Sequence, residues 1–371
     1  MAIKTAVIGM GGIGYTHARA YANDPLAELI AVCDINKEKA DKAAEEFGVR
    51  AFYSVKELCE GLGDELEAVS VCTSGYENGS FHYEPAMECL TYGKKVLCEK
   101  PLCADIQDAR DLVNYALKNR LYLGCNLNHY FTDIAAKAKG WMDAGEIGET
   151  VYCLHKVGFD GSDYGYGGVG DLKSRWLKPY SHCKAFLTHP FSVMRYFCGD
   201  IVQVQAFLDR PGVRKTAGDP MLSINSVNCK FEKGGVGVLI SQRGDARFGL
   251  GGWWSYEHAG TKGTFCIENC VEQLTYWRGH QKDEEGKLYL PKPEVINTGI
   301  TSFDATFPAR IHAWLEDLTN NVHYEFIRSS GRDALATLEY IEAVIQSYEN
   351  GGATVRPHPL PAIHGTPEYI H

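Results

Sequence analysis

The chain has 371 residues, of which 45% are hydrophobic and 23% charged, and its formal net charge at pH 7 is −10. This length suits two domains, each with its own core. The acidic balance and the lack of a long Lys/Arg run argue against a nucleic-acid partner, and no apolar stretch has the length of a membrane span. Because the N-terminus leads into an apolar run and not into a signal peptide, we expect a soluble, cytoplasmic protein.

A short apolar run near the N-terminus leads directly into a glycine-rich turn with the pattern G-x-G-x-x-G. In a dinucleotide-binding βαβ unit the first glycine permits a sharp turn, the second lets the backbone approach a pyrophosphate, and the third brings the helix close to the strand. The helix N-terminus adds N–H groups and a positive dipole end for the phosphates. We therefore predict that the cofactor is bound by Gly9, Gly11, Gly12, Ile13 and Gly14.

Asp34, which closes the next apolar run, indicates which dinucleotide is bound. A carboxylate at this point accepts hydrogen bonds from a ribose and disfavours a 2′-phosphate. The sequence thus predicts NAD as the cofactor, with NADP less favoured. Lys37 is the one hint of a 2′-phosphate partner, and it is more simply a solvated residue in the next helix.

Up to residue 126, short apolar runs alternate with helical stretches, which is typical of a parallel sheet covered on both faces. The expected strands are 4–9, 28–34, 51–54, 68–73, 95–99 and 121–126. The expected helices are 14–23, 37–47, 83–92 and 105–119. Ser54 and Glu57 have capping-box spacing at the start of another short helix. We assign residues 1–126 to an NAD-binding Rossmann domain with a doubly wound parallel sheet.

After residue 126, strands follow one another without regular crossover helices, which predicts a large, open and mainly antiparallel sheet. A helix at 133–144 precedes strands at 150–157, 201–208, 222–231, 235–242 and 263–268, and helices at 304–320 and 331–349 follow. The predicted fold class is α/β, with residues 127–371 as a second α/β domain for substrate binding and oligomerisation. An alternative is that its last helices pack against the first domain. An open sheet face often mediates oligomerisation, so we expect a homodimer or homotetramer.

Thirteen cysteines are scattered through the chain, mostly in apolar runs, with no Cys-x-x-Cys pair and no Cys/His spacing of a zinc site. This distribution indicates small buried side chains in a reducing compartment. We expect no metal.

The strand expected at 95–99 ends in the motif Glu99-Lys100-Pro101. Together with the glycine motif, this ending resembles the Gfo/Idh/MocA oxidoreductases, the group that includes glucose–fructose oxidoreductase and inositol dehydrogenase. The resemblance extends over nearly the whole chain and also includes residues 71–73, His82 and residues 124–128, 145–149, 259–264 and 350–352. It implies a Rossmann domain followed by an α/β domain with a large open sheet.

A lysine at the carboxyl end of a parallel strand suits hydride transfer, because its ammonium group can donate to the reacting oxygen and stabilise negative charge there. The resemblance implies catalysis by Lys100 and cofactor contacts by Thr73, His82, Glu99, Lys100 and Asn128. Without the resemblance, each residue has a simpler interpretation. Lys100 is then a surface lysine, Thr73 is part of an ordinary strand-end turn, and His82 is a helix cap.

His189 is the second predicted catalytic residue, near the beginning of a helix expected from the apolar spacing of residues 186–197. An alcohol that loses a hydride also loses a proton, and a histidine that titrates near neutrality can accept it. Members of the resembled family often have Asp-x-x-x-His here, whereas Ala185 stands at the position of that carboxylate. The alternative for His189 is a structural histidine held by backbone hydrogen bonds.

Further polar and aromatic residues are candidates for contacting the substrate, and they are His129, Tyr164, Trp176, His182 and Lys184. Tyr164 and Trp176 lie in or after the glycine-rich loop 160–171, which has the alternatives of a flexible connection and a substrate lid. His129 stands where the family tends to have arginine, which disfavours strongly anionic substrates. It has the alternative of a structural histidine.

These residues predict an NAD-dependent oxidoreductase that moves a hydride between nicotinamide C4 and a secondary alcohol or ketone of a sugar, cyclitol or related polyol. Lys100 holds the reacting oxygen and His189 acts as acid and base. Two alternatives stay open. One is glycosidase-type oxidation, elimination and re-reduction with a retained NAD, and the other is a non-catalytic NAD-sensing regulator.

Overall fold

A computed structural model describes residues 2–74, 81–159, 178–216, 218, 220–243 and 252–364. The chain folds into two compact units. Unit 1 comprises Met1–Asn128, Phe307–Leu338 and Pro359–His371, and unit 2 comprises His129–Thr306 and Glu339–His358. Residues 307–338 thus group with unit 1, and a domain boundary after residue 126 stays a prediction.

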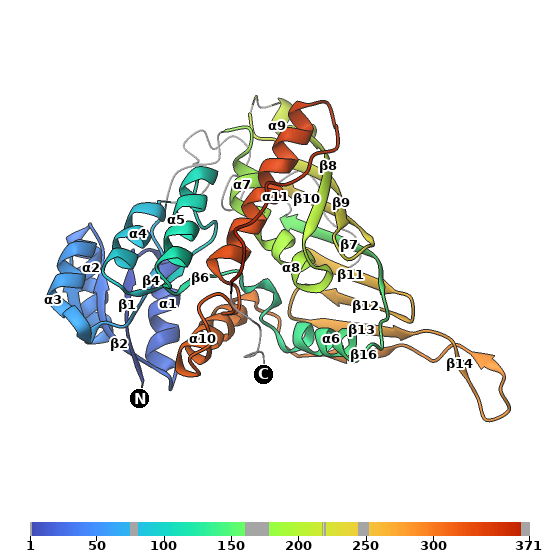
Figure 1. Ribbon diagram of the computed structural model, residues 1–371, viewed down its shortest axis with the longest axis horizontal. Coiled ribbons are helices and arrows are strands. Elements are labelled where there is room, and N and C mark those ends of the chain that lie inside the picture. The colour runs from blue at the N-terminus through green and yellow to red at the C-terminus, as the bar shows by residue number, and fades with distance from the viewer. Residues whose placement is uncertain are drawn as a thin grey trace. The chain divides into compact units, whose positions relative to one another are not determined.

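Unit 1 is built on a six-stranded parallel sheet with the order β3-β2-β1-β4-β5-β6 (Figure 1). The strands are β1 (Ile3–Ile8), β2 (Ala27–Cys33), β3 (Arg50–Phe52), β4 (Ala68–Val71), β5 (Lys95–Cys98) and β6 (Leu123–Cys125). The strand order reverses between β1 and β4. In doubly wound sheets, ligands bind beyond the carboxyl ends of the strands at this reversal. The predicted doubly wound Rossmann sheet is confirmed.

Helices of unit 1 alternate with these strands. They are α1 (Gly12–Asn23), α2 (Lys37–Phe47), α3 (Val55–Leu62), α4 (Tyr83–Thr91) and α5 (Ile106–Lys118), with a 3₁₀ turn η1 (Gly63–Glu65) after α3. The helix cap predicted at Ser54 is confirmed, because the Ser54 side chain accepts a hydrogen bond from the Glu57 backbone N–H. Sequence pattern and local hydrogen bonding therefore agree at the start of α3.

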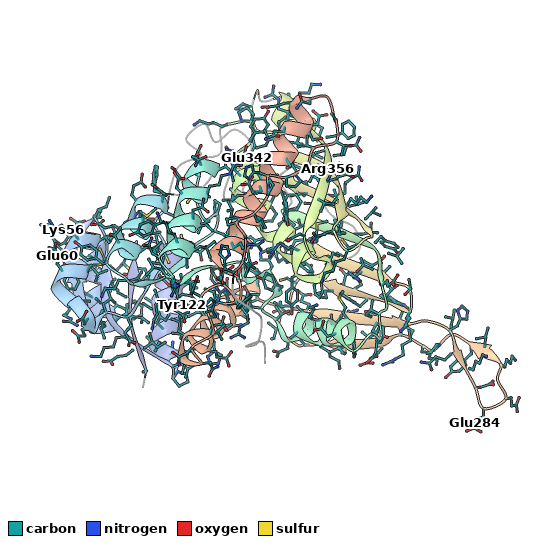
Figure 2. All side chains as sticks on the ribbon, in the orientation of Figure 1. Lys56, Glu60, Tyr122, Glu284, Glu342 and Arg356 are labelled. Atoms are coloured by element: carbon teal, nitrogen blue, oxygen red, sulfur yellow. The ribbon has the colours of Figure 1, made fainter. Side chains whose placement is uncertain are left out.

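A later segment completes the core of unit 1. Ile311 and Trp314 of α10 (Thr306–Thr319) are buried in the same apolar cluster as Val7 and Leu97 of the sheet. The hydroxyl of Tyr122, which Figure 2 labels, donates to the carbonyl of Val322 at 2.9 Å. These contacts give a physical reason for the grouping of residues 307–338 with unit 1.

Unit 2 contains an eight-stranded sheet with the order β16-β13-β12-β11-β7-β10-β9-β8. Its strands are β7 (Thr150–Phe159), β8 (Ile201–Asp209), β9 (Ile224–Phe231), β10 (Val236–Arg243), β11 (Trp254–Gly260), β12 (Gly263–Glu268), β13 (Gln273–Arg278) and β16 (Glu294–Asn297). Neighbouring strands run antiparallel except for β7 and β10, which are parallel. The mainly antiparallel sheet is therefore confirmed, while β11, β13 and β16 are strands that the sequence did not predict.

A hairpin of β14 (Gln281–Lys282) and β15 (Leu288–Tyr289) extends away from this sheet (Figure 1). Glu284, labelled in Figure 2, lies in the connection between these two strands. Because the connection carries a run of charged residues, it is suited to solvent.

The remaining helical elements of unit 2 are η2 (Asn128–Tyr130), whose first residue belongs to unit 1, α6 (Asp133–Asp143), α7 (Ser181–Phe186), α8 (Thr188–Cys198), α9 (Gly212–Thr216) and η3 (Phe303–Ala305). The last part of α11 (Gly331–Glu349) also belongs to unit 2. Helix α8 packs against β7, whose Cys153, His155 and Val157 are buried, whereas Leu154 between them is exposed. The sheet thus has a covered face and an open face.

His155 lies on the covered face with its Nδ1–H donating to the carbonyl of Ser255 at 2.9 Å. Burial lowers the pKa of His155 to about 4. An unfolded histidine titrates near pH 6.5, so between these values the unfolded chain binds more protons than the folded one. Stability is therefore lost as the pH falls from about 6.5 to about 4, by ~3 kcal/mol from this group alone.

We expect the variant His155→Gln, which keeps an N–H donor but does not titrate, to lose less stability on acidification than the wild type. Urea unfolding at neutral and at mildly acidic pH measures this difference. The exposed His280 provides the matched control His280→Gln, which should follow the wild type. Equal pH dependence in His155→Gln and wild type would contradict the role of this burial.

Candidate active site

The glycine-rich turn joins β1 to α1. Gly9 has φ +92°, and a Cβ at this residue would lie 2.7 Å from the backbone N of Thr73. A Cβ at Gly14 would lie 1.9 Å from the carbonyl oxygen of Gly9, whereas Gly11 and Gly12 have nothing within 4 Å of an added Cβ. The packing of the turn itself therefore requires Gly9 and Gly14, while the other two glycines leave room for a ligand to approach the backbone.

The N-terminus of α1 can receive an anion. Gly11 is the N-cap residue, and among the described residues no side chain caps the helix. Ile13 in the first turn is exposed. The first N–H groups and the positive end of the helix dipole are thus available to a pyrophosphate.

Asp34 holds the glycine turn in place. Its Oδ2 accepts from the Met10 backbone N–H at 2.7 Å, and its Oδ1 accepts from the Asn36 N–H at 2.8 Å. Each carboxylate oxygen has a further lone pair, so hydrogen bonds from a ribose remain feasible. The ammonium of Lys37 lies over the ring of Tyr53, 5.0 Å from its centroid. Asp34 therefore has a structural role in addition to the predicted cofactor role.

A buried carboxylate directly precedes Lys100. Glu99 Oε1 accepts from His17 Nε2 at 2.9 Å and from Asn126 Nδ2 at 2.5 Å, and Oε2 accepts from the Lys100 backbone N–H at 3.1 Å. Burial by itself raises the pKa of Glu99, but the hydrogen bonds and charges of His17, Asn126 and Lys100 hold that pKa below its usual value. Glu99 therefore stays ionised at neutral pH.

The hydrogen-bond network continues into the core of unit 1. His17 Nδ1 is 3.0 Å from Ser70 Oγ, which is 2.7 Å from the hydroxyl of Tyr21. His17 and Tyr21 lie on α1, Ser70 on β4, and Asn126 directly after β6. These four residues were not predicted as site residues from the sequence, although His17 and Tyr21 have the i, i+4 spacing of one helix face. The network connects the helix after the glycine turn to the turn that carries Lys100.

The turn at Lys100 is also held from its other side. His82 is buried, and its Nδ1 lies 2.7 Å from the Pro101 carbonyl, to which the ring N–H donates. Burial lowers the pKa of His82. Thr73 Oγ1 donates to the carbonyl of Phe81 at 2.6 Å, and Lys100 is half-buried. Contacts of Thr73, His82 and the buried Asn128 with the cofactor stay predictions.

In unit 2, two predicted residues lie in direct contact. His189 is the second residue of α8, and its ring stacks on that of His129, with centroids 3.7 Å apart and planes at 9°. Both rings are buried. Nδ1 of His129 accepts a hydrogen bond from the Trp254 indole N–H at 3.2 Å. The structure thus brings together His129 and His189 from separate segments and adds Trp254 of β11.

The other predicted substrate residues of α7 have protein partners. His182 is buried, with Nε2 2.9 Å from Ser241 Oγ, and its ring stacks on Phe186. The Lys184 ammonium lies 3.2 Å from a carboxylate oxygen of Glu342 on α11, which Figure 2 labels. Substrate contacts of His182 and Lys184 stay predictions. The predicted loop residues Tyr164 and Trp176 lie outside the described residues.

All thirteen cysteines are free and buried. Within the described ranges, no group of three or more His, Cys, Asp or Glu residues is arranged to hold a metal ion. In the same ranges, no helix combines the length and apolar character needed to cross a membrane.

Comparisons with known proteins identify the cofactor unit. Residues 3–127 match the Gfo/Idh/MocA model, described as an oxidoreductase family with an NAD-binding Rossmann fold. The chain is 30% identical over 168 residues to inositol 2-dehydrogenase of Pseudomonas savastanoi pv. phaseolicola, covering 44% of this chain and 49% of that protein. It is 26% identical over 297 residues to myo-inositol 2-dehydrogenase of Thermotoga maritima, covering 78% and 81%.

Solved structures resemble nearly the whole chain in fold. Levoglucosan dehydrogenase in complex with NADH and L-sorbose superposes with a TM-score of 0.79 at 18% identity, over 96% of this chain and 100% of the other. A probable dehydrogenase from Thermotoga maritima gives a TM-score of 0.76 at 22% identity, over 95% and 98%. At these identities the likeness establishes the fold.

The inositol 2-dehydrogenase of Pseudomonas and an uncharacterized oxidoreductase of Streptococcus pneumoniae are matched over 49% and 39% of their own lengths, so the chain's match spans less than half of these relatives. The match is concentrated in the unit that carries the glycine turn, Asp34 and the Lys100 turn. Residues 3–127 thus match the NAD-binding Rossmann fold of the Gfo/Idh/MocA oxidoreductase family.

Proposed function

We propose that this protein is an NAD-dependent oxidoreductase that transfers a hydride between nicotinamide and a secondary alcohol or ketone of a sugar, cyclitol or related polyol. The observation that carries the proposal is the position of Lys100 at the carboxyl end of β5, where a buried ionised carboxylate and His82 hold its turn. Relatives named inositol 2-dehydrogenase and D-glucoside 3-dehydrogenase support the substrate class.

The residues of the glycine turn fit NAD. The backbone at Gly11 and Gly12 has space in front of it, and the first turn of α1 offers N–H groups to a pyrophosphate. The Asp34 carboxylate would accept from a ribose hydroxyl and repel a 2′-phosphate. When bound, NAD supplies the hydride acceptor at nicotinamide C4. The preference for NAD over NADP thus rests on the charge of Asp34.

Lys100 would donate a hydrogen bond from its ammonium group to the reacting oxygen. As the carbon–hydrogen bond of the alcohol breaks, this oxygen carries developing negative charge, which a fixed cation stabilises. Such stabilisation depends on a donor that is already in place. The three hydrogen bonds of Glu99 and the contact of His82 with the Pro101 carbonyl would supply that rigidity.

His189 would accept the proton that the hydroxyl releases and return it during reduction. We propose that it acts in the same reaction as Lys100. Trp253, half-buried, meets the His129 ring edge to face, with centroids 6.0 Å apart, and its indole offers an apolar face for the C–H side of a sugar ring. These aromatic side chains favour a neutral polyol over an anionic substrate.

We keep an NAD-sensing regulator as a second candidate, because Ala185 provides no carboxylate one turn before His189. Both functions require NAD binding, but only the enzyme consumes NAD. A glycosidase-type reaction would also oxidise a sugar, but its cofactor would remain bound and no free NADH would accumulate. Accumulation of free NADH therefore distinguishes the dehydrogenase from both alternatives, and cleavage of a glycoside without free NADH distinguishes the glycosidase from the sensor.

Replacing Lys100 tests the proposed chemistry. We expect a screen of inositols and sugars with NAD to give reduced cofactor in the wild type, and Lys100→Ala to lower kcat/KM about 100- to 1000-fold. Lys56→Ala, on the exposed surface of α3 (Figure 2), serves as the matched control. Undiminished turnover in Lys100→Ala would contradict the proposed mechanism. A preference for NADP would contradict the role of Asp34.

Replacing Glu99 tests whether the buried network positions Lys100. We expect Glu99→Gln, which keeps the shape of the side chain but removes its charge, to lower kcat roughly 10- to 100-fold with a much smaller change in KM. The control is Glu60→Gln on the exposed face of α3. A purely structural network would lower the unfolding midpoint and leave kcat of the folded enzyme unchanged.

For the oligomer, we propose that a second copy of this chain binds to the open face of the unit 2 sheet. Leu154, Val236 and Ile240 on the adjacent strands β7 and β10 are 45%, 54% and 38% exposed and form an apolar strip. Lys156 and Glu257 flank the strip with opposite charges, which a two-fold related copy can pair. An exposed apolar strip of this kind is typical of an interface.

A double variant, Leu154→Glu with Ile240→Glu, should therefore abolish assembly, because two carboxylates in the contact would be desolvated. Size-exclusion chromatography with light scattering should give a multiple of 41.1 kDa for the wild type and 41.1 kDa for the variant. Leu288→Glu on the hairpin is the control and should assemble normally. A monomeric wild type, or an assembled double variant, would refute this interface.

A further inference from the structure

We propose that His129 is the positioning residue of His189. Held neutral by the indole N–H of Trp254, its ring orients the His189 imidazole and restricts the stacked pair to a single positive charge, which His189 carries when it is protonated. This inference rests on the proposed function, in which His189 is the acid and base.

The ring stack fixes the plane of His189. With centroids 3.7 Å apart and planes at 9°, the two imidazoles are in van der Waals contact over their faces. Phe186 meets His189 edge to face at 6.3 Å and 72°, so a second aromatic ring limits rotation. His129 is itself packed against the ring of Phe303 at 4.8 Å. His189 therefore cannot turn about χ2 without displacing buried rings.

Trp254 determines the tautomer of His129. An indole nitrogen donates and cannot accept, so Nδ1 of His129 must be the acceptor in their 3.2 Å hydrogen bond. A proton on Nδ1 would bring two N–H groups face to face. Trp254 is buried and packs against the ring of His155, so it cannot easily withdraw. His129 is therefore neutral, with its proton on Nε2.

Because His129 stays neutral, an additional proton taken up by the pair resides on His189. Two imidazolium rings at this separation would repel each other strongly in a buried place. One imidazolium on a neutral aromatic ring is instead a favourable stack. Ala185, one turn before His189, provides no carboxylate to orient or charge the imidazole. We infer that the ring stack supplies this orientation.

The titratable groups around the pair agree with a single positive charge. The Cys270 thiol donates to the His129 carbonyl at 3.2 Å, and burial raises the pKa of this thiol, so it is neutral. Burial lowers the pKa of His155, which touches Trp254, to about 4. Phe186 stacks on His182 and has the Arg243 guanidinium 6.0 Å from its ring. This nearby cation opposes a second positive charge on the pair.

The protonation states can be measured without any substrate. Full-length protein labelled with ¹⁵N-histidine is titrated by NMR from about pH 5 to 8, with signals assigned by His129→Asn and His189→Asn. We expect His129 to keep the shifts of a neutral ring with its proton on Nε2, while His189 titrates in one step. Titration of His129 in the wild type would overturn the proposal.

Trp254→Phe keeps a ring but removes the N–H donor. In this variant we expect His129 to take up a proton in the same pH range and the titration of His189 to shift to lower pH by about one unit or more, because the two charges interact. An unchanged His189 titration would also overturn the proposal. Since NMR needs no turnover, failure here and failure of the proposed dehydrogenase activity are separate results.

Two substitutions at His129 separate stacking from hydrogen bonding. His129→Phe keeps a ring to stack, whereas His129→Asn keeps an acceptor for Trp254 but has no ring. We expect His129→Asn to lower kcat at least tenfold with a smaller change in KM, and His129→Phe to retain most of kcat. The pH at half-maximal kcat/KM should follow the His189 titration in each variant. Equal activity of the two variants, or the opposite order, would contradict positioning by the stack.

Discussion

The three hydrogen bonds to the buried carboxylate of Glu99 fix the geometry on which the cofactor unit depends. A buried carboxylate is costly unless donors surround it, and here the donors come from α1, from the residue after β6 and from the Lys100 backbone. Satisfying this one charge fixes helix α1, which we propose to receive the phosphates, and the turn that carries Lys100. The Asp34 carboxylate acts similarly on the glycine turn. The proposed phosphate binding and the proposed hydride chemistry would thus use the same edge of the sheet.

Much of unit 1 could be predicted because its signals are local. The amphipathic pattern gave α2 with its observed bounds, and apolar runs located all six strands. In unit 2 the strand β12 was predicted with its bounds, but β11 and β13 were not. The parallel pairing of β7 with β10 depends on contacts between distant segments. Such pairing leaves no local signal in the sequence.

The residues of the candidate site also differ in whether their signals in the sequence are local. Gly9, Gly14 and Lys100 stand in motifs whose spacing follows from backbone geometry, so sequence alone could locate them. His17 and Trp254 could not be assigned, because each acts through a partner far along the chain. On α1, His17 looks like any residue of the buried face. A hydrogen-bond network of this kind becomes visible only when the elements are folded together.

Deuterium transfer is the most direct measurement of the proposed function. The protein is incubated with NAD and a polyol substrate that carries deuterium on its carbon atoms, and the nicotinamide product is examined by mass spectrometry. Hydride transfer predicts one deuterium in each NADH molecule formed, with transfer lost in Lys100→Ala. NAD that binds but stays oxidised, while all deuterium remains on the polyol, would contradict an oxidoreductase and favour an NAD sensor.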